Sequence, residues 1–317
     1  MTFYTMFYLR EDARADTNFA ENGFMRLNGY VRCCEVLCSS LRRQGHELKL
    51  LTNNEVAIRG HLTEDLDIVN IDFHLEVPKD VKFYGAHFKI DAFKWIAENG
   101  DKYSILIDND VLCLNPMPRS LGVLMADGIP VYYDITDQVY PAYSQERIIR
   151  DKSRIMGVDS FGLWAGGELV GGPPDFFRRL HEECMALWPR YSADPSDFHH
   201  QSDEMVVSCA IEMLLKKNLF IIDAGKIGVI TRYWSIKTLH IGRPLEAAYD
   251  NFLIHLPADK EYISELCRLG SIGFPQDYKR YCDMKAKRSR KRIWPVKMTK
   301  KAVTKLGSIL KGLREER

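Results

Sequence analysis

The sequence predicts an α/β fold in which a mostly parallel sheet carries helices on both faces. Short apolar runs rich in β-branched and aromatic residues alternate with longer segments of helical periodicity. Alternation at this spacing is typical of βαβ units, whose parallel strands are covered by the connecting helices. The chain has 317 residues, 46% hydrophobic and 27% charged, which is ordinary for a folded, water-soluble protein with a sizeable core.

The expected elements follow from these patterns in chain order. The opening MTFYTMFYLRED holds nine residues before its first charge, Arg10, and lacks the basic start of a signal peptide, so it predicts a buried first strand. No window reaches the roughly 18 consecutive apolar residues of a membrane-spanning helix, so none is expected. The predicted strands cover residues 2–9, 47–52, 67–71, 104–107, 130–133, 166–171 and 219–223. The clearest helical patterns cover residues 29–44, 86–98, 175–188 and 201–217.

The eight cysteines are scattered, and they form no paired CxxC motif with neighbouring histidines at zinc spacing. This usage argues against a structural zinc site and against a secreted disulfide scaffold. We therefore expect reduced cysteines and a cytoplasmic protein.

The charge is divided unevenly along the chain. Residues 285–317 hold 13 Lys and Arg against two Glu, whereas the rest of the chain is acidic. We predict two parts, a domain at 1–283 and a basic amphipathic helix at 284–317 with Trp294 near its entry. The apolar residues of that helix recur at helical spacing: Val296, Val303, Leu306, Leu310 and Leu313.

The basic tail has three interpretations: a helix lying on an anionic membrane surface, an arm that binds nucleic acid, and a solvated helix. The acidic body offers no second basic face, so we favour the membrane surface and expect no nucleic-acid partner.

Two acids, Asp108 and Asp110, follow the predicted strand 104–107 directly in ILIDNDVLCLNP. Ligands of open α/β sheets bind at the carboxyl ends of the strands, where these acids would lie. Two carboxylates at the end of a buried strand are costly to desolvate unless a cation compensates them. Mg²⁺ or Mn²⁺, with nucleotide phosphates as further ligands, would do so.

ILIDNDVLCLNP and four segments in the same order, the first of which runs into these acids, resemble the GT-A-fold glycosyltransferases. In that family a DxD motif holds a nucleotide-sugar diphosphate through a divalent ion. The resemblance covers most of residues 1–260 and is closest to the group that includes glycogenin and bacterial lipopolysaccharide galactosyltransferases, although no HxxGxxKPW-like segment follows His255. It implies a GT-A-like, Rossmann-type domain. The similar segments are AHFKIDAFKWIAENGDKYSILIDND, SFGLWAGGELVGG, HHQSDEMVVSCAIEML and NFLIHLP.

The resemblance also implies roles for particular residues. Asp108, Asp110 and His255 would bind the metal, and Asp203 and Glu204 would act in catalysis. The donor would be bound by Lys89, Asp91, Asp108, Gly166 and Gly167.

Each of these residues has a structural alternative. Lys89 and Asp91 also fit a solvated helix face, the glycines fit a bulged strand, and acids such as Asp203 commonly complement the start of a helix.

Taken together, the sequence leads us to expect a metal-dependent hexosyltransferase. It would move a sugar from a nucleotide-sugar, with a UDP-hexose as the favoured donor, to a lipid-linked polysaccharide or lipopolysaccharide acceptor. The reaction would take place at the inner face of the membrane. Two alternatives remain, a DxD phosphohydrolase and a non-catalytic membrane-surface scaffold. The nucleophile strand of a phosphohydrolase usually opens its domain, and no later GDxxxD-like motif is found.

Overall fold

The computed structural model describes residues 1–10, 23–269 and 276–287. The chain divides into two compact units, Met1–Ile272 and Gly273–Arg317. In the second unit, residues 276–287 are helical. Most of the predicted tail lies outside the described residues, so the division into a domain at 1–283 and a membrane-surface helix at 284–317 stays a prediction.

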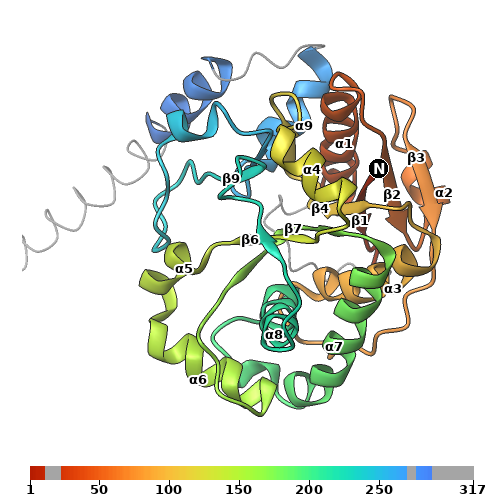
Figure 1. Cartoon of the computed structure of the whole chain (residues 1–317). Helices are drawn as coiled ribbons and strands as arrows, with labels where there is room; N and C mark the ends of the chain where they lie inside the picture. Colours follow the sequence, from red (N-terminus) through yellow and green to blue (C-terminus); the bar gives the residue numbers. More distant parts are fainter. Residues whose placement is uncertain (11–22, 270–275, 288–317) are drawn as a thin grey trace, which may run out of the picture. The chain divides into compact units, whose positions relative to one another are not determined.

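A seven-stranded sheet with the order β3-β2-β1-β4-β7-β6-β8 forms the centre of the first unit (Figure 1). Four of its six strand pairs are parallel, and β7 runs antiparallel to both of its neighbours, β4 and β6. The strands are β1 (Thr2–Phe7), β2 (Leu48–Thr52), β3 (Asp67–Asn70), β4 (Ser104–Ile107), β6 (Val131–Asp134), β7 (Ala165–Gly172) and β8 (Ile222–Asp223).

A second, three-stranded sheet has the order β5-β10-β9 and is built from β5 (Val111–Cys113), β9 (Ile230–Arg232) and β10 (Leu253–His255). β10 pairs antiparallel with β5 and parallel with β9. In this register His255 lies opposite Val111 on one side and Arg232 on the other. The small sheet therefore brings the end of β10 beside the segment that follows β4.

Helices cover both faces of the large sheet, with α1, α4 and α9 on one side and α3, α7 and α8 on the other (Figure 1). The short α2 lies near β3, and α5 and α6 connect β6 to β7. The helices are α1 (Gly23–Arg42), α2 (Glu55–Arg59), α3 (Lys89–Asn99), α4 (Arg119–Ala126), α5 (Thr136–Tyr143), α6 (Gln145–Met156), α7 (Pro174–Ser192), α8 (Asp203–Lys216) and α9 (Lys260–Leu269), with 3₁₀ turns at Tyr84–Phe88, Pro195–Asp197 and Leu245–Ala248. None of the described helices is long and apolar enough to cross a membrane.

The predicted α/β class, with a mostly parallel sheet and helices on both faces, is confirmed. The prediction missed the reversed direction of β7, which returns between β4 and β6 after α5 and α6, two helices that were not among the predicted helical segments. The strand predicted at 219–223 is also shorter than expected. Asn218 has a φ of 62°, and Leu219 donates its backbone N–H to Leu214, so α8 ends in a left-handed turn there and only Ile222–Asp223 pair.

Candidate functional site: an acid-rich cavity at the end of β4

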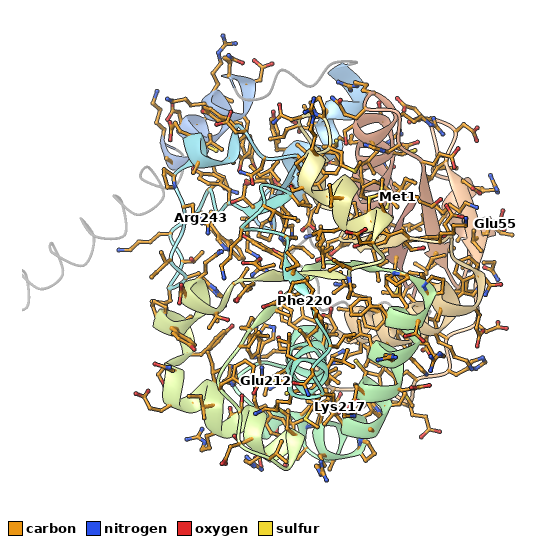
Figure 2. All side chains as sticks on the ribbon, viewed as in Figure 1. Met1, Glu55, Glu212, Lys217, Phe220 and Arg243 are labelled. Atoms are coloured by element: carbon orange, nitrogen blue, oxygen red, sulfur yellow. The ribbon has the colours of Figure 1, made fainter. Side chains whose placement is uncertain are left out.

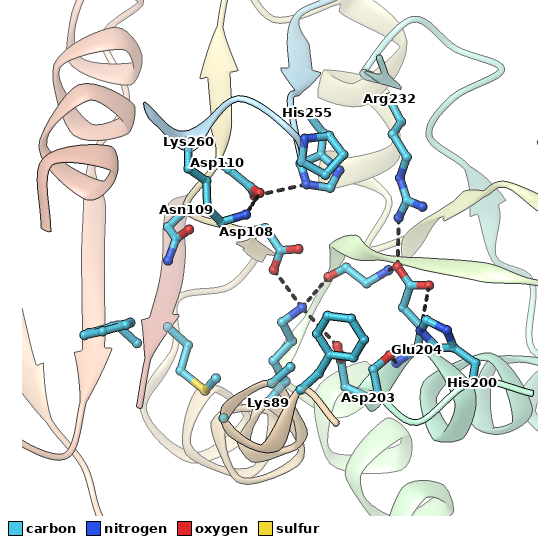
Figure 3. A pocket seen from close by; sticks show the side chains of 18 of the residues that line it. Lys89, Asp108, Asn109, Asp110, His200, Asp203, Glu204, Arg232, His255 and Lys260 are labelled. Carbon is cyan, nitrogen blue, oxygen red and sulfur yellow. Dashed lines mark hydrogen bonds and ion pairs between the residues drawn. The ribbon is translucent and has the colours of Figure 1, made fainter. Parts of the chain in front are cut away.

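A cavity of about 370 Å³ opens at the carboxyl ends of β1 and β4 (Figure 3). Its aromatic side is formed by Phe7, Tyr8 and Tyr30. Its polar side is formed by residues from the β4–β5 turn, the start of α8, and the ends of β9 and β10. Charged residues that are far apart in the sequence therefore meet at one place, as the position of the two acids after β4 predicted.

The turn that carries the two acids is fixed through its backbone. The amide of Asp108 donates to the carbonyl of Glu168 in β7 at 3.2 Å, and the carbonyl of Asp110 accepts from Leu256 at 3.0 Å. The turn is thus held between the two sheets. Asp108 remains partly exposed to the cavity, with 28% of its side chain accessible, whereas the side chain of Asp110 is 4% exposed.

Asp108, Asp110 and His255 form a group suited to a metal ion. Each offers one ligand atom, and the three atoms lie within 4.8 Å of one another. Carboxylate oxygen and imidazole nitrogen together are suitable ligands for Mn²⁺. Figure 3 shows the His255 ring directed at Asp110 from the end of β10. The structure therefore brings together the three residues for which the resemblance implied metal binding.

The contacts of His255 show that a positive charge is required between its ring and the carboxylate of Asp110. Its Nδ1 lies 3.2 Å from Oε1 of Glu168, and its Nε2 lies 3.0 Å from Oδ1 of Asp110. If Nδ1 carries the proton, Nε2 and the carboxylate oxygen face each other with lone pairs and need a positive charge between them. Burial alone would lower the pKa of His255, but Asp110 and Glu168 outweigh it and raise the pKa to about 9. A proton or a metal ion can supply that charge.

Lys89 holds three acceptors at once from the first turn of α3. Its ammonium group lies 2.7 Å from Asp108 and 2.9 Å from Asp203, and it donates to the carbonyl of Gly167 at 2.8 Å. An ammonium group has three protons, so these contacts use all of them. Lys89 organises the acids of the cavity, and the predicted contact with a diphosphate requires it to exchange one of these partners.

Asp203 and Glu204 occupy the first turn of α8, and Ser202 caps the helix by accepting from the amide of Glu204 at 3.2 Å. Glu204 accepts from Arg232 at 2.8 Å, from Nε1 of Trp164 at 3.1 Å and from the amide of Gly167 at 3.1 Å. Burial raises the pKa of Glu204, but Arg232 overcomes this and holds it well below its usual range. Burial raises the pKa of Asp203 to about 6 despite the opposing effect of Lys89.

The two glycines differ in their surroundings. Gly167 lines the cavity, and a Cβ on it would lie 3.0 Å from Oδ2 of Asp203. A Cβ on Gly166 would overlap with the carboxylate of Glu168 and lie 3.3 Å from Arg232. Gly166 thus gives room to an ion pair. The strand is also irregular here, because the pairing of β6 with β7 shifts its register between Tyr132 and Asp134.

Asp91 does not line the cavity. Its carboxylate accepts from the backbone amides of His74 at 3.1 Å and Leu75 at 3.0 Å, so it fixes the loop that precedes α3. The role in donor binding that the resemblance implied for Asp91 has no support in this geometry.

Three charged residues of the cluster were missed from the sequence. Glu168 is fully buried in β7, Arg232 ends β9, and Lys260 forms an ion pair with Asp110. A signal for Glu168 was present, because it is the single charge in the apolar, glycine-rich stretch AGGELVGG. A buried lone acid in a strand requires a cationic partner, although the sequence does not reveal which one.

The charges of this cluster are not balanced among themselves. Five carboxylates (Asp108, Asp110, Glu168, Asp203 and Glu204) face three permanent cations (Lys89, Arg232 and Lys260), with His255 between them. With His255 protonated, as its raised pKa implies, the excess is one negative charge. When a metal ion replaces that proton, the excess becomes two, which is the charge that one divalent cation neutralises. The residues present therefore fit a divalent metal in both ligand type and charge.

The chain is similar to several solved structures at low identity. One is the galactosyltransferase LgtC in complex with donor and acceptor sugar analogues, with 11% identity, 88% of this chain and 99% of that chain covered, and a TM-score of 0.48. Another is the bifunctional glycosyltransferase WbbM, with 9% identity, 80% and 45% coverage, and a TM-score of 0.48. Mouse xyloside xylosyltransferase 1 gives 12% identity, 80% and 96% coverage, and a TM-score of 0.44. No protein-family model matches the chain, and no curated protein matches it in sequence.

Proposed function

We propose that the chain is a metal-dependent glycosyltransferase that transfers a sugar from a nucleotide-sugar to a glycan acceptor. The favoured donor is a UDP-hexose. The observation that carries the proposal is the convergence of Asp108, Asp110 and His255 on one point of a cavity beside which carboxylates outnumber permanent cations. The sequence segments that resemble GT-A-fold glycosyltransferases also support it, because the resemblance extends beyond these three residues to SFGLWAGGELVGG and HHQSDEMVVSCAIEML.

The residues present would divide the work as follows. Asp108, Asp110 and His255 would hold Mn²⁺ or Mg²⁺, which supplies positive charge to a leaving diphosphate. Lys89 keeps Asp108 and Asp203 in place at the start of the reaction. The aromatic side of the cavity, next to the end of β1, is suited to the flat face of a nucleotide base.

Asp203 is better placed than Glu204 to contact a sugar or acceptor hydroxyl. Both residues line the cavity, but three donors occupy the carboxylate of Glu204, whereas the ion pair of Asp203 with Lys89 uses only Oδ2. We assign Asp203 the contact with the reacting hydroxyls and Glu204 the positioning of the start of β7 around Gly167. Correct placement of the reactants contributes a large part of the rate enhancement of an enzyme.

The proposal is tested by titration calorimetry with UDP and UDP-hexoses, with and without Mn²⁺, followed by assays of sugar release and transfer. We expect tight donor binding only with Mn²⁺, and slow Mn²⁺-dependent hydrolysis of one UDP-hexose. Asp197→Asn serves as a control, because Asp197 is an exposed acid whose ion pair with Arg154 lies outside the cavity lining.

Two other outcomes would overturn the proposal. Release of phosphate from a phosphate ester, without any use of UDP-sugars, would indicate a phosphohydrolase. Absence of metal-dependent binding to any nucleotide-sugar would favour a non-catalytic scaffold.

We further propose that the acceptor is lipid-linked and that the basic tail attaches the protein to the inner face of the membrane. The support lies in the 13 Lys and Arg of residues 285–317, each of which contributes about 1 kcal/mol near an anionic surface. Deletion of residues 285–317 is expected to abolish co-sedimentation with phosphatidylserine vesicles at low salt and to preserve Mn²⁺-dependent UDP-sugar hydrolysis. Equal vesicle binding by the truncated and full chains would remove the tail as anchor.

A further inference from the structure

Glu168 joins the two sheets of the first unit through its side chain. It belongs to β7 of the large sheet, and its carboxylate contacts Arg232 and His255, which end β9 and β10 of the small sheet. Its side chain is fully buried and does not line the cavity. Glu168 therefore touches neither the space for a substrate nor the atoms that face a metal.

Both oxygens of Glu168 are used. Arg232 donates through Nε to Oε1 at 2.7 Å and through Nη2 to Oε2 at 2.5 Å, and Nδ1 of His255 lies 3.2 Å from Oε1. The paired contacts of the guanidinium fix the plane of the carboxylate, because a bidentate ion pair has one favoured geometry. The carboxylate in turn fixes where Nδ1 of His255 must point.

This arrangement selects one form of the imidazole. A carboxylate can only accept, so Nδ1 carries a proton toward Glu168, and a metal ion that replaces the proton between Nε2 and Asp110 would meet the lone pair of Nε2. Nε2 is the atom that completes the group with Asp108 and Asp110. A histidine ligand with its other nitrogen on a carboxylate is oriented and made more basic, which strengthens its bond to a metal.

The same contacts extend to the sugar side of the cavity. Nη2 of Arg232 also donates to Oε1 of Glu204 at 2.8 Å, and Glu204 holds the amide of Gly167 at 3.1 Å. His255, Glu168, Arg232 and Glu204 thus form a chain of alternating charge from the metal ligands to the start of α8. Figure 3 shows the contact between Arg232 and Glu204. We call these four residues the charge chain.

We propose that Glu168 is a positioning residue that sets the proton and the orientation of His255 for metal binding and, through Arg232, links the metal site to the Gly167–Glu204 wall of the cavity. This inference rests on the metal site of the proposed function and adds a residue to it that no ligand touches.

The first test is Mn²⁺ affinity, measured by electron paramagnetic resonance on the full chain. Glu168→Gln keeps the shape of the side chain but loses its charge and one acceptor for Arg232. We expect it to bind Mn²⁺ about 10- to 100-fold more weakly than the wild type, the range found when the partner of a metal-binding histidine is removed. Glu168→Asp keeps the charge but is shorter by one methylene, so a smaller loss is expected.

Glu212→Gln is the matched control. Glu212 is another fully buried glutamate, paired with Lys152, but it does not line the cavity. Its substitution should lower stability and leave Mn²⁺ affinity within about twofold of the wild type, measured at a temperature where circular dichroism shows each variant folded. If Glu212→Gln lost as much Mn²⁺ affinity as Glu168→Gln, general destabilisation would explain both losses.

The decisive test repeats the substitution where His255 is absent. If Glu168 acts through His255, Glu168→Gln should change Mn²⁺ affinity less than about twofold in a His255→Ala background, measured with saturating UDP. A full loss in that background, or no loss in the wild-type background, overturns the inference while the metal site stands. If the wild-type protein binds no Mn²⁺, both the inference and the metal dependence fail. A misfolded Glu168→Gln is replaced by Glu168→Asp in the same cycle.

Discussion

Two of the buried networks of charge in the first unit differ in one respect. The charge chain of His255, Glu168, Arg232 and Glu204 ends at a cavity, beside Asp110 and Asp203. A second network, which we call the helix pair, joins Lys152 of α6 to Glu212 of α8 at 2.8 Å with both side chains fully buried. Figure 2 labels Glu212 at α8, within the helical half of the unit.

The helix pair is closed on itself. Glu212 accepts from Ser160 and from the amide of Phe161, each at 2.8 Å, and Lys152 also donates to the carbonyls of Leu163 and Ser208. One positive charge meets one negative charge, and the surrounding donors and acceptors hold the segment that enters β7. The charge chain, by contrast, belongs to a cluster with an excess of acid that faces a cavity. The difference teaches that burial of charge alone does not mark a site, whereas an unbalanced cluster that faces open space does.

The largest expected effect is on the open side of the comparison, at Asp110. Asp110→Asn removes a carboxylate ligand, and we expect Mn²⁺-dependent transfer or hydrolysis to fall by about a thousandfold or more because the leaving diphosphate loses its counter-charge. Steady-state assays across Mn²⁺ concentrations measure the loss. Retention of more than a tenth of the activity at saturating Mn²⁺ would remove Asp110 from the metal site.

Breaking the helix pair should lower the stability of the fold, in contrast to the loss of Mn²⁺-dependent activity expected at Asp110. Lys152→Met leaves Glu212 buried without a cation, and loss of one partner from such a pair costs about 3–5 kcal/mol of unfolding free energy. Urea unfolding measures this cost. The double variant Lys152→Met with Glu212→Leu should regain much of the stability, since an apolar pair needs no compensation. A change in Mn²⁺ affinity in the double variant would show that the two networks are not separate.

Two buried histidines, His87 and His255, have pKa values that are shifted in opposite directions. His87 is buried, its Nδ1 lies 3.2 Å from the carbonyl of Phe83, and its Nε2 lies 2.8 Å from the hydroxyl of Tyr191. Burial lowers its pKa to about 4. In the unfolded chain His87 takes up a proton below about pH 6.5, whereas in the folded chain its burial opposes protonation. As the pH falls from 6.5 to 4, His87 should therefore lower the free energy of unfolding by about 3 kcal/mol.

Urea unfolding at several pH values checks this expectation. His87→Gln should flatten the dependence in that window, because glutamine does not titrate. An equally steep loss of stability in the variant would place the responsible group elsewhere. His255 differs from His87 because acids surround it, and its pKa is raised instead of lowered.

The smallest effect concerns Gly166, whose lack of a side chain makes room for the charge chain. Gly166→Ala places a methyl group against the carboxylate of Glu168, and we expect a loss of about 1–3 kcal/mol in stability together with weaker Mn²⁺ binding. Gly122→Ala in α4 is the control, because a Cβ there meets nothing within 4 Å and alanine favours a helix by about 0.5–1 kcal/mol. Unchanged Mn²⁺ affinity in Gly166→Ala would argue against the charge chain as a support of the metal site.

Much of the large sheet could be predicted from the sequence because its strands are apolar on both faces. Strand β4 has the predicted bounds, and β2, β3 and β7 deviate by a residue at one or both ends. The small sheet was not predicted from periodicity, since three-residue strands such as β5 and β9 are too short to show one. Only β10 was expected, through the resemblance of NFLIHLP to a late strand that ends in histidine.

The candidate site was predictable where its residues stand next to strong local signals. Asp108 and Asp110 follow a buried strand, and the structure brings His255 to them. Arg232 and Lys260 have no such signal, because their partners lie far along the chain and only the fold brings them together. Asp91 stands beside Lys89 in sequence, but on a helix the two side chains point in different directions, toward a loop and toward the cavity.

The position of β10 near the end of the first unit has a consequence for how the protein is made. All strands of the large sheet are complete once residue 223 has been synthesised, but β5 has to wait for β10, its partner, which ends at His255. At the usual rates of translation, the ribosome needs on the order of ten seconds to pass from Asp110 to His255. During that interval the two acids remain in water with neither His255 nor Lys260 beside them. A nascent chain therefore completes its large sheet before His255 reaches the two acids, and a chain that terminates before β10 would carry a whole large sheet with an unpaired β5.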